Sequence, residues 1–259
     1  MSAYGVAAGL GRISQSGLQL YLDSKNIKSY PGSGATWTDL TRNGRNFTLS
    51  NPSYYSFETS SKSIKFSRTV APAAENGGYA DVTVAGSLAS GTYLYGNHTT
   101  EIWAKINNSS PTNTEATETL SALFVYRGWH SMFYYDTSSL NYAIFNSTVS
   151  QVSAPSASIG LSNTNIIIGS WFYASVVRSG NTLTTYINGI SLGSSSFAAP
   201  SVNTQVSNNL RIAIGNNIGA QYTWNADCNV SVVRMYNRAL SATEILQSYN
   251  VEKKRFGHT

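Results

Sequence analysis

The sequence predicts an all-β protein, built as a two-sheet antiparallel sandwich with one short helix near its end. Three observations carry this prediction. Only 11% of the 259 residues are charged, and Ser, Thr, Asn and Gly crowd the remainder, a composition that favours sheets and turns. Apolar and polar residues alternate in short runs, with the two-residue period of extended strands. These runs recur roughly every ten residues between turn signals, the spacing of a sandwich.

The clearest strands lie in residues 171–195. Residues 171–178 and 182–187 both alternate cleanly. Ser179-Gly180-Asn181 closes the first reversal and Asn188-Gly189 the second, because Asn and Gly adopt at low cost the positive backbone angles of tight hairpins. Local chemistry alone therefore predicts three consecutive antiparallel strands here.

The remaining strands are predicted from the same alternation. They are expected at residues 17–23, 36–40, 63–66, 79–84, 100–106, 120–126, 132–135, 142–145, 210–214 and 230–236. Residues 100–106 alternate most regularly, which places Ile102 on one side of the strand and Glu101 and Trp103 on the other.

One helix is predicted close to the C-terminal end. Ser241-Ala242-Thr243-Glu244 is a capping box, in which the Ser hydroxyl caps the Glu amide and the Glu carboxylate returns to the Ser amide. Leu240 and Ile245 occupy the hydrophobic-staple positions around it. We expect a short helix that ends near Tyr249.

The chain divides into three predicted parts. Residues 1–16 are small and lack a usable period, so they form an N-terminal arm. Residues 17–250 form a single jelly-roll domain, a size that one β domain can reach. Residues 251–259 form a basic C-terminal tail.

Five segments, in their order and spacing, resemble the concanavalin A-like jelly rolls of the laminin-G type. They are GLQLYLDSKNIKSYPGSGATWTDLTRNGRN, TTEIWAKI, TLTTYINGISLGS, LRIAIGNN and VSVVRMYNRALSATEILQSYN. The last segment, a strand that feeds the capped helix, is the most specific. Together with the closing Arg255-Phe256-Gly257, the whole chain resembles the laminin-G-like structural proteins of tailed bacteriophage virions.

The resemblance implies a sandwich that binds glycans or proteins, in some members with calcium. It favours a non-enzymatic virion structural or decoration protein, assembled in the host cytoplasm with other virion proteins as an oligomer or part of a larger assembly, and contributing to adhesion to cell-surface glycans. A dedicated receptor-binding lectin is the alternative, and a polysaccharide-active enzyme comes third.

The two ends suggest how such a protein would assemble. We hypothesise that they are docking arms which order against neighbouring subunits, because a jelly roll is complete without them. Ordinary frayed ends remain an equal alternative. The proposed arm residues are Tyr4, Lys253, Lys254, Arg255 and Phe256.

Enzymatic chemistry is not expected. Glycosidases of this fold class resemble one another in an E-x-D-x-E or E-x-D-x-x-E strand, and no such run occurs here. Glu115 and Glu118 lie in a polar loop without an intervening Asp. Residues 189–193 match G-x-S-x-G, but Ser191 falls in a strand that returns from a hairpin, whereas a nucleophile elbow needs a strand-to-helix turn.

The best candidate for glycan binding is the aromatic run at residues 126–136, because flat rings stack on the apolar faces of sugars while polar neighbours meet the hydroxyls. Rings that simply fill the core are the alternative interpretation, and the more common one for any single residue. A second candidate lies in the loop around Trp224. The candidate residues are Trp129, His130, Tyr134, Asp136 and Trp224.

Metal binding has weaker support. Asp81, Asp136 and Asp227 near strand ends are candidate oxygen ligands for calcium, without the dense D-x-D-x-D loop of a dedicated site. His98, His130 and His258 lack the spacing of a zinc site.

Net charge and the N-terminal sequence exclude other classes. The net charge is +5, but Lys and Arg are scattered apart from residues 253–255, so no nucleic-acid partner is expected. Residues 1–17 lack a basic start and a sustained apolar core, so we expect no signal peptide, and no run is long enough for membrane insertion.

Overall fold

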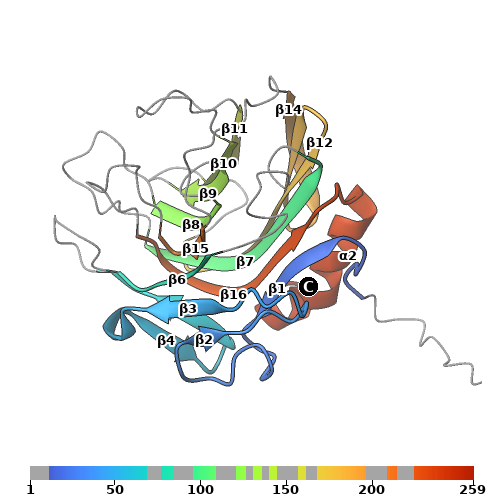
Figure 1. The fold of residues 1–259 in the computed structure, drawn as a ribbon. Helices are drawn as coiled ribbons and strands as arrows, with labels where there is room; N and C mark the ends of the chain where they lie inside the picture. Colours follow the sequence, from blue (N-terminus) through green and yellow to red (C-terminus); the bar gives the residue numbers. More distant parts are fainter. Residues whose placement is uncertain are drawn as a thin grey trace, which may run out of the picture.

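In the part of the chain that the structure describes, the strands form two eight-stranded sheets, and every strand pair within them is antiparallel. The computed structural model describes residues 12–68, 77–83, 96–108, 121–126, 131–135, 140–144, 157–161, 168–196, 209–214 and 225–259. Figure 1 shows the first sheet, here sheet A, curving around the second, sheet B. The predicted all-β, two-sheet sandwich with one short C-terminal α-helix is confirmed.

Sheet A has β7 and β16 at its centre. Its order is β14 (Ile190–Ser196), β13 (Thr182–Ile187), β12 (Trp171–Ser179), β7 (His98–Asn108), β16 (Asp227–Tyr236), β5 (Ser63–Phe66) and β4 (Tyr55–Glu58), and β1 (Leu18–Asp23) also pairs with β16. Every residue of β16 after Asp227 is buried, including the polar Asn229, Ser231 and Arg234. β16 thus joins β1, β5 and β7 into one sheet.

Sheet B places the middle of the chain opposite the start of the domain. Its order is β11 (Ala157–Leu161), β10 (Leu140–Ile144), β9 (Ser131–Tyr135), β8 (Ser121–Tyr126), β15 (Asn209–Ile212), β6 (Tyr79–Thr83), β3 (Phe47–Ser50) and β2 (Thr36–Trp37). A short 3₁₀ turn, η1 (Pro52–Tyr54), leads from β3 into β4 and so from sheet B to sheet A.

The two predicted hairpins are present. Asn188 and Gly189 both have positive φ, of 51° and 80°, as a type I′ turn requires. In the first hairpin Ser179 pairs with Thr182, and Gly180 has a φ of 59°. Both reversals therefore form through the residues that predicted them.

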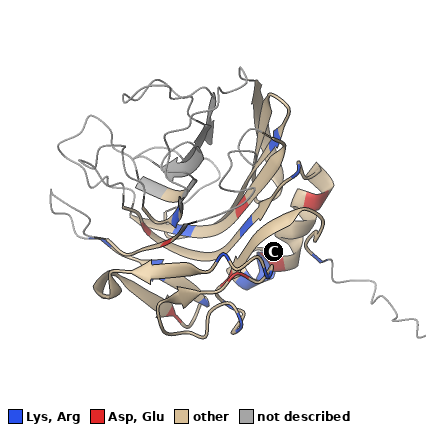
Figure 2. Ribbon diagram, viewed as in Figure 1, with Lys and Arg blue, Asp and Glu red and all other residues tan. Residues whose placement is uncertain are grey.

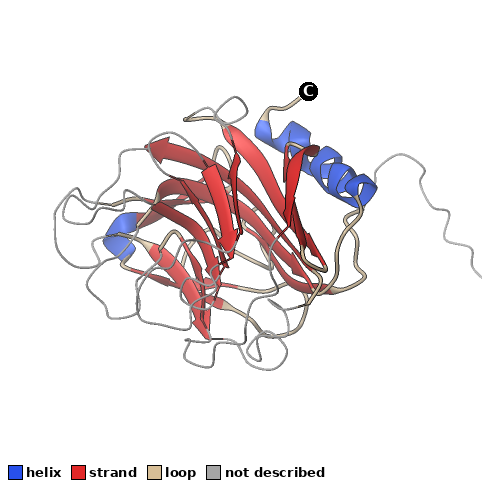
Figure 3. Cartoon of the chain, turned by 90° about the horizontal axis from the view of Figure 1, so that it is seen from above, coloured by secondary structure: helices blue, strands red, loops and turns tan. Residues whose placement is uncertain are grey.

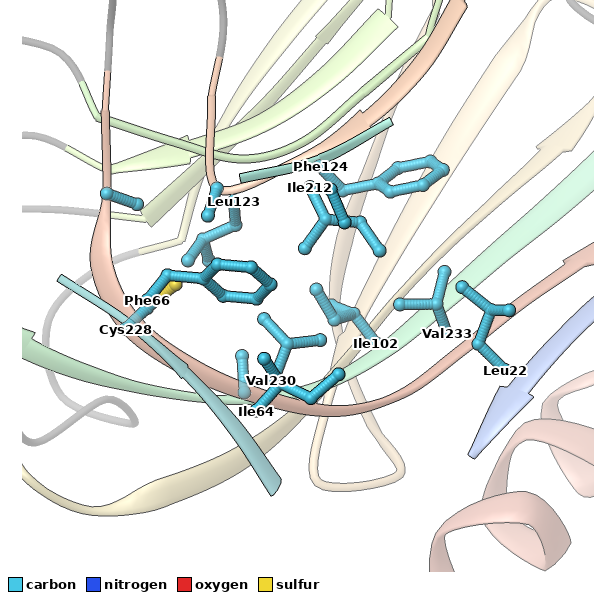
Figure 4. Close-up of a cluster of buried hydrophobic side chains, with 14 of the residues drawn as sticks. Leu22, Ile64, Phe66, Ile102, Leu123, Phe124, Ile212, Cys228, Val230 and Val233 are labelled. Carbon is cyan, nitrogen blue, oxygen red and sulfur yellow. The ribbon is translucent and has the colours of Figure 1, made fainter. Parts of the chain in front are cut away.

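The main core fills the space between the sheets. Ile102, Val230 and Val233 of sheet A meet Phe124 and Ile212 of sheet B in one buried cluster (Figure 4). The lone Cys228 lies in this cluster, and burial raises the pKa of its thiol. The alternation predicted for residues 100–106 is confirmed, because Ile102 faces this core and Trp103 does not.

The opposite face of sheet A carries a second buried cluster beneath the C-terminal helix, α2 (Ala242–Glu252) (Figure 3). Trp103 and Val232 from the sheet pack with Ile245 from the helix. The capping box forms as predicted: the Ser241 hydroxyl accepts from the Glu244 amide, and the Glu244 carboxylate accepts from the Ser241 amide. Both faces of the centre of sheet A are therefore covered.

The structure differs from the prediction at four elements. β3, β4 and β11 were not predicted; the first two are only four residues long, and β11 (ASIGL) is built largely of small residues with little alternation. The helix continues to Glu252 and into a 3₁₀ turn, η4 (Lys253–Phe256), which ends at Gly257 with a φ of 81°. The expected end near Tyr249 and the separate tail from residue 251 are thus wrong.

No helix in the described ranges is long and apolar enough to cross a membrane.

Candidate binding surface

Strands β8, β9 and β10 are the scaffold of the predicted glycan site. Trp129, His130, Asp136 and Trp224 lie outside the described residues. Tyr134 lies in β9, where it pairs with Ala122 of β8 and Asn141 of β10. The connection from β8 enters β9 at Ser131, whereas the connection to β10 leaves at Tyr135, so the two connections start from opposite ends of β9. A five-residue strand is about 15 Å long.

Asp81 lies in β6 of sheet B, opposite Arg211 of β15 and Thr48 of β3. Burial raises the pKa of the Asp81 carboxyl above its ordinary value, and the positive charge of Arg211 opposes this shift. The cross-strand Arg211 thus supplies the partner expected of a partly buried carboxylate.

Asp227 lies at the start of β16 in sheet A, so Asp81 and Asp227 belong to different sheets. The Asn107 amide donates to Asp227 Oδ1 at 3.2 Å and to Asn229 Oδ1 at 3.0 Å. Asp136, the third predicted calcium ligand, is outside the described ranges. Within those ranges no three His, Cys, Asp or Glu side chains converge in a way that could hold a metal ion.

A polar network that the sequence did not reveal continues from Asn229 across the outer face of sheet A. Asn229 donates to Glu58 Oε2 at 3.1 Å and to Ser63 Oγ at 2.9 Å. Lys105 Nζ lies 3.7 Å from the same Glu58 oxygen and 5.8 Å from the centre of the Trp171 ring. Because these residues lie on five different strands, sequence spacing offers no signal for their meeting.

Two carboxylates approach one arginine beneath α2. Arg234 Nε donates to Glu101 Oε2 at 2.5 Å, and Arg234 Nη1 and Nη2 each donate to Glu252 at 2.9 Å. The Glu101 and Arg234 side chains are fully buried, and that of Glu252 is 9% exposed. Tyr173 also donates to Glu101, at 2.7 Å.

This network is a structural lock and not a catalytic pair. Burial alone would lower the pKa of Arg234, but the charges of Glu252 and Glu101 raise it above its ordinary value. Burial and the adjacent charge of Glu101 raise the pKa of Tyr173. Both carboxylates are paired with Arg234, Glu101 is fully buried and Glu252 nearly so, which is the arrangement of a structural ion pair.

The predicted C-terminal arm residues are part of the fold. Phe256 is 7% exposed and stacks on Trp103, with ring centres 4.1 Å apart. Arg255 Nη1 donates to Asp23 Oδ1 at 2.8 Å. Lys253 Nζ donates to the Thr259 carbonyl at 2.9 Å, whereas Lys254 is exposed. The prediction that residues 251–259 form a tail separate from the domain is therefore corrected, because Phe256 belongs to the second buried cluster. Tyr4 lies outside the described residues.

The histidine and serine candidates are also dispersed. His98 is buried in β7, and His258 contacts the Tyr249 hydroxyl and the Trp171 carbonyl through its two ring nitrogens. Ser191 lies within β14, so it is not a nucleophile elbow. His130, Glu115 and Glu118 are outside the described ranges.

Comparison with known proteins agrees with the architecture. The family model described as the concanavalin A-like lectin/glucanases superfamily matches residues 74–246, which is more than half of the chain. No curated protein matches.

Solved structures with the same fold include receptor-binding domains of botulinum neurotoxins. The serotype D binding domain is 12% identical to this chain, with a TM-score of 0.63. The DC binding domain in complex with rat synaptotagmin II is 13% identical, with a TM-score of 0.64. A type C structure, described with cell entry that depends on interaction with two ganglioside molecules, is 14% identical, with a TM-score of 0.65. Each match covers 90% of this chain and 51% of the other, so the chain spans about half the length of these structures.

Proposed function

This chain belongs to the concanavalin A-like lectin/glucanases superfamily, and from that premise we propose a non-enzymatic virion structural or decoration protein that contributes to adhesion to surface glycans. The observation that carries the non-enzymatic part is the lock of Glu101 and Glu252 on Arg234. A glycosidase needs two carboxylates that face a sugar across an open cleft. Here the described pair is buried and shares one arginine, Arg234, instead of facing a cleft.

Support for the virion role comes from the sequence resemblance, which includes the closing Arg255-Phe256-Gly257. A density map of assembled particles tests it directly: we expect the sandwich at symmetric positions on the particle surface. Particles that form normally and lack the protein would contradict the role. Such a map would also reveal the oligomeric state and the neighbouring virion proteins.

Support for glycan adhesion comes from the lectin-like sandwich and from the aromatic residues next to β9. Since the connections before and after β9 start about 15 Å apart, a ligand that touches both would be an oligosaccharide and not a single sugar. Glycan-array binding that weakens in Trp129→Ala, and does not weaken in Trp171→Ala, would support this site. Repeating the array with a calcium chelator tests whether glycan binding depends on calcium.

A dedicated receptor-binding lectin is the second candidate, favoured by the ganglioside and synaptotagmin partners of the similar structures. A lectin predicts tight, specific glycan binding and loss of host adsorption when that binding is removed. A decoration protein predicts no binding on the glycan array, or host adsorption that does not change when the glycan binding is removed. Release of reducing ends from bacterial polysaccharides would instead support an enzyme.

A further inference from the structure

A group of basic side chains, here called the basic corner, gathers where three distant segments meet. Figure 2 shows Lys and Arg around the C-terminal end of the chain. The segments are the turn after β1, the turn between β4 and β5, and η4. The members of the basic corner are Lys25, Lys28, Lys62, Lys254 and Arg255.

Hydrogen bonds fix these segments side by side. The Lys62 carbonyl accepts from Ser24 Oγ at 2.6 Å and from Arg255 Nη2 at 3.1 Å. Arg255 also reaches Asp23 at 2.8 Å. Arg255 therefore holds together the three backbone segments that carry Lys25, Lys62 and Lys254.

Arg255 is paired with Asp23, so the positive charge that the basic corner offers to a ligand comes from its four lysines. Lys25, Lys28, Lys62 and Lys254 are all exposed. The neighbouring acids are already engaged: Asp23 by Arg255, Glu252 by Arg234, and Glu58 by Lys105 and Ser61. Because each of these acids already has a basic partner, none is paired with Lys25, Lys62 or Lys254 in the ion pairs of the described residues.

The chemistry around the lysines indicates the class of ligand. Two aliphatic side chains are exposed near them, Ile27 at 79% and Val251 at 43%, and both can pack against the apolar faces of sugar rings. The described rings at this corner are unavailable for stacking with bases, because Phe57 lies under Lys62 and Phe256 is buried under Arg255. Nucleic-acid binding to single strands relies on such stacking.

We propose that the basic corner binds anionic polysaccharide through its sulfate, phosphate or carboxylate groups. The proposal rests on the glycan-binding function above and adds a second surface to it, on the α2 side of sheet A. Ion pairs with exposed lysines are weak one by one and additive along a polymer, so the binding should be multivalent and sensitive to salt.

The experiment measures binding of the intact protein to immobilised dextran sulfate and polygalacturonate, with neutral dextran as the blank. Lys25→Glu, Lys62→Glu and Lys254→Glu should each weaken binding roughly threefold to tenfold, since each reversal removes an attraction and adds a repulsion. Arg42→Glu is the matched control: Arg42 is exposed next to Asn43, which contacts Gln19 at the other end of β1, and its reversal changes the net charge equally. The control should weaken binding less than about twofold.

Three outcomes overturn the proposal: equal losses in Arg42→Glu and the lysine variants, equal binding to neutral dextran, or tighter binding to a single-stranded DNA of matched charge. Failure here is separable from failure of the proposed function. If Trp129→Ala abolishes array binding and the lysine variants change nothing, the basic corner is wrong and the glycan role stands. If only the lysine variants lose binding, the basic corner stands and the glycan site next to β9 is wrong.

Discussion

At the scale of single residues, Arg234 joins the centre of sheet A to the last turn of α2 through Glu101 and Glu252. Replacing it with Met would leave Glu101 charged and buried without a cation. We expect Arg234→Met to lower the free energy of unfolding by about 3 to 5 kcal/mol. Urea denaturation followed by tryptophan fluorescence measures this loss.

Arg238→Met is the matched control for that measurement. Arg238 also pairs with a glutamate, Glu244, but both side chains are 29% exposed. Water already solvates this pair, so the expected loss is at most about 1 kcal/mol. Equal losses in the two variants would show that burial of the Arg234 network adds nothing to stability.

The same exposed pair gives the protein a defined sensitivity to acid. The hydrogen bond from Arg238 and those from Ser241 lower the pKa of Glu244 from 4.5 to about 2, against the opposing effect of burial. Because the pKa is lower in the folded state, the stabilising contribution is present above pH 4.5 and is lost as the pH falls towards 2. Glu244→Gln should therefore be less stable than the wild type at neutral pH. Between pH 4.5 and 2 it should lose less stability than the wild type does.

Thermal unfolding at a series of pH values checks the effect of Glu244. Arg238→Met should flatten the same acid window, since it removes the largest cause of the shift. Parallel pH curves for the wild type and Glu244→Gln would contradict the assignment.

At the scale of elements, the turn between β13 and β14 is also a contact with α2. A Cβ on Gly189 would lie 2.9 Å from Leu246 Cδ1 and 3.2 Å from Tyr249 Cδ1. Gly189→Ala should cost about 2 to 3 kcal/mol, from the positive φ of 80° together with this overlap.

Gly180→Ala separates the two causes of that loss. Gly180 has a φ of 59° in the neighbouring hairpin, and a Cβ there meets nothing within 4 Å. Only the backbone cost of about 1 to 2 kcal/mol should appear. Chemical denaturation measures the loss of stability in each variant. If α2 does not constrain the turn at Gly189, the two losses will be equal.

The segment η4 contributes Phe256 to the second buried cluster, on the face of sheet A beneath α2. Phe256 lies between Trp103 and Trp171, at ring-centre distances of 4.1 and 4.7 Å. Phe256→Ala should lower stability by about 3 to 5 kcal/mol and shift tryptophan emission to the red, as water reaches the indoles. Lys254→Ala, in the same turn but exposed, should change neither quantity.

The sequence predicted those elements whose local pattern agrees with their environment. The hairpins at Gly180 and Asn188 and the capping box at Ser241 form through short-range contacts, and these were predicted. Burial of Glu101 could not be predicted, because alternation assigns it to the outer face without revealing that α2 covers that face.

The candidate site is less predictable from sequence than the fold. Alternation and turn signals place Tyr134 in a strand, but they do not reveal which strands become neighbours. The basic corner has the same origin: Lys25, Lys62 and Lys254 are far apart in the chain, and only the pairing of β1 and β5 with β16, followed by the return of α2, brings them together.

At the scale of the whole molecule, closure of sheet A depends on its last strand. β16 pairs with β1, β5 and β7, and Asn237 donates to the carbonyl of Gly17. A fragment that ends at residue 226 would keep most strands and lose the one that joins them. We expect this fragment to show no cooperative unfolding transition and to be digested rapidly by protease, whereas residues 12–259 resist it.

The central position of β16 also has a consequence for synthesis in the cell. A ribosome releases the chain from its N-terminal end at about 5 to 20 residues per second, so β1 emerges roughly ten seconds or more before its partner exists. Once they are made, β5 and β7 also wait for β16, the strand that lies between them in sheet A. Nascent chains of this protein should therefore depend on a holding chaperone until translation is almost finished. Once the chain leaves the ribosome, β16 can pair with β1, β5 and β7 and complete sheet A.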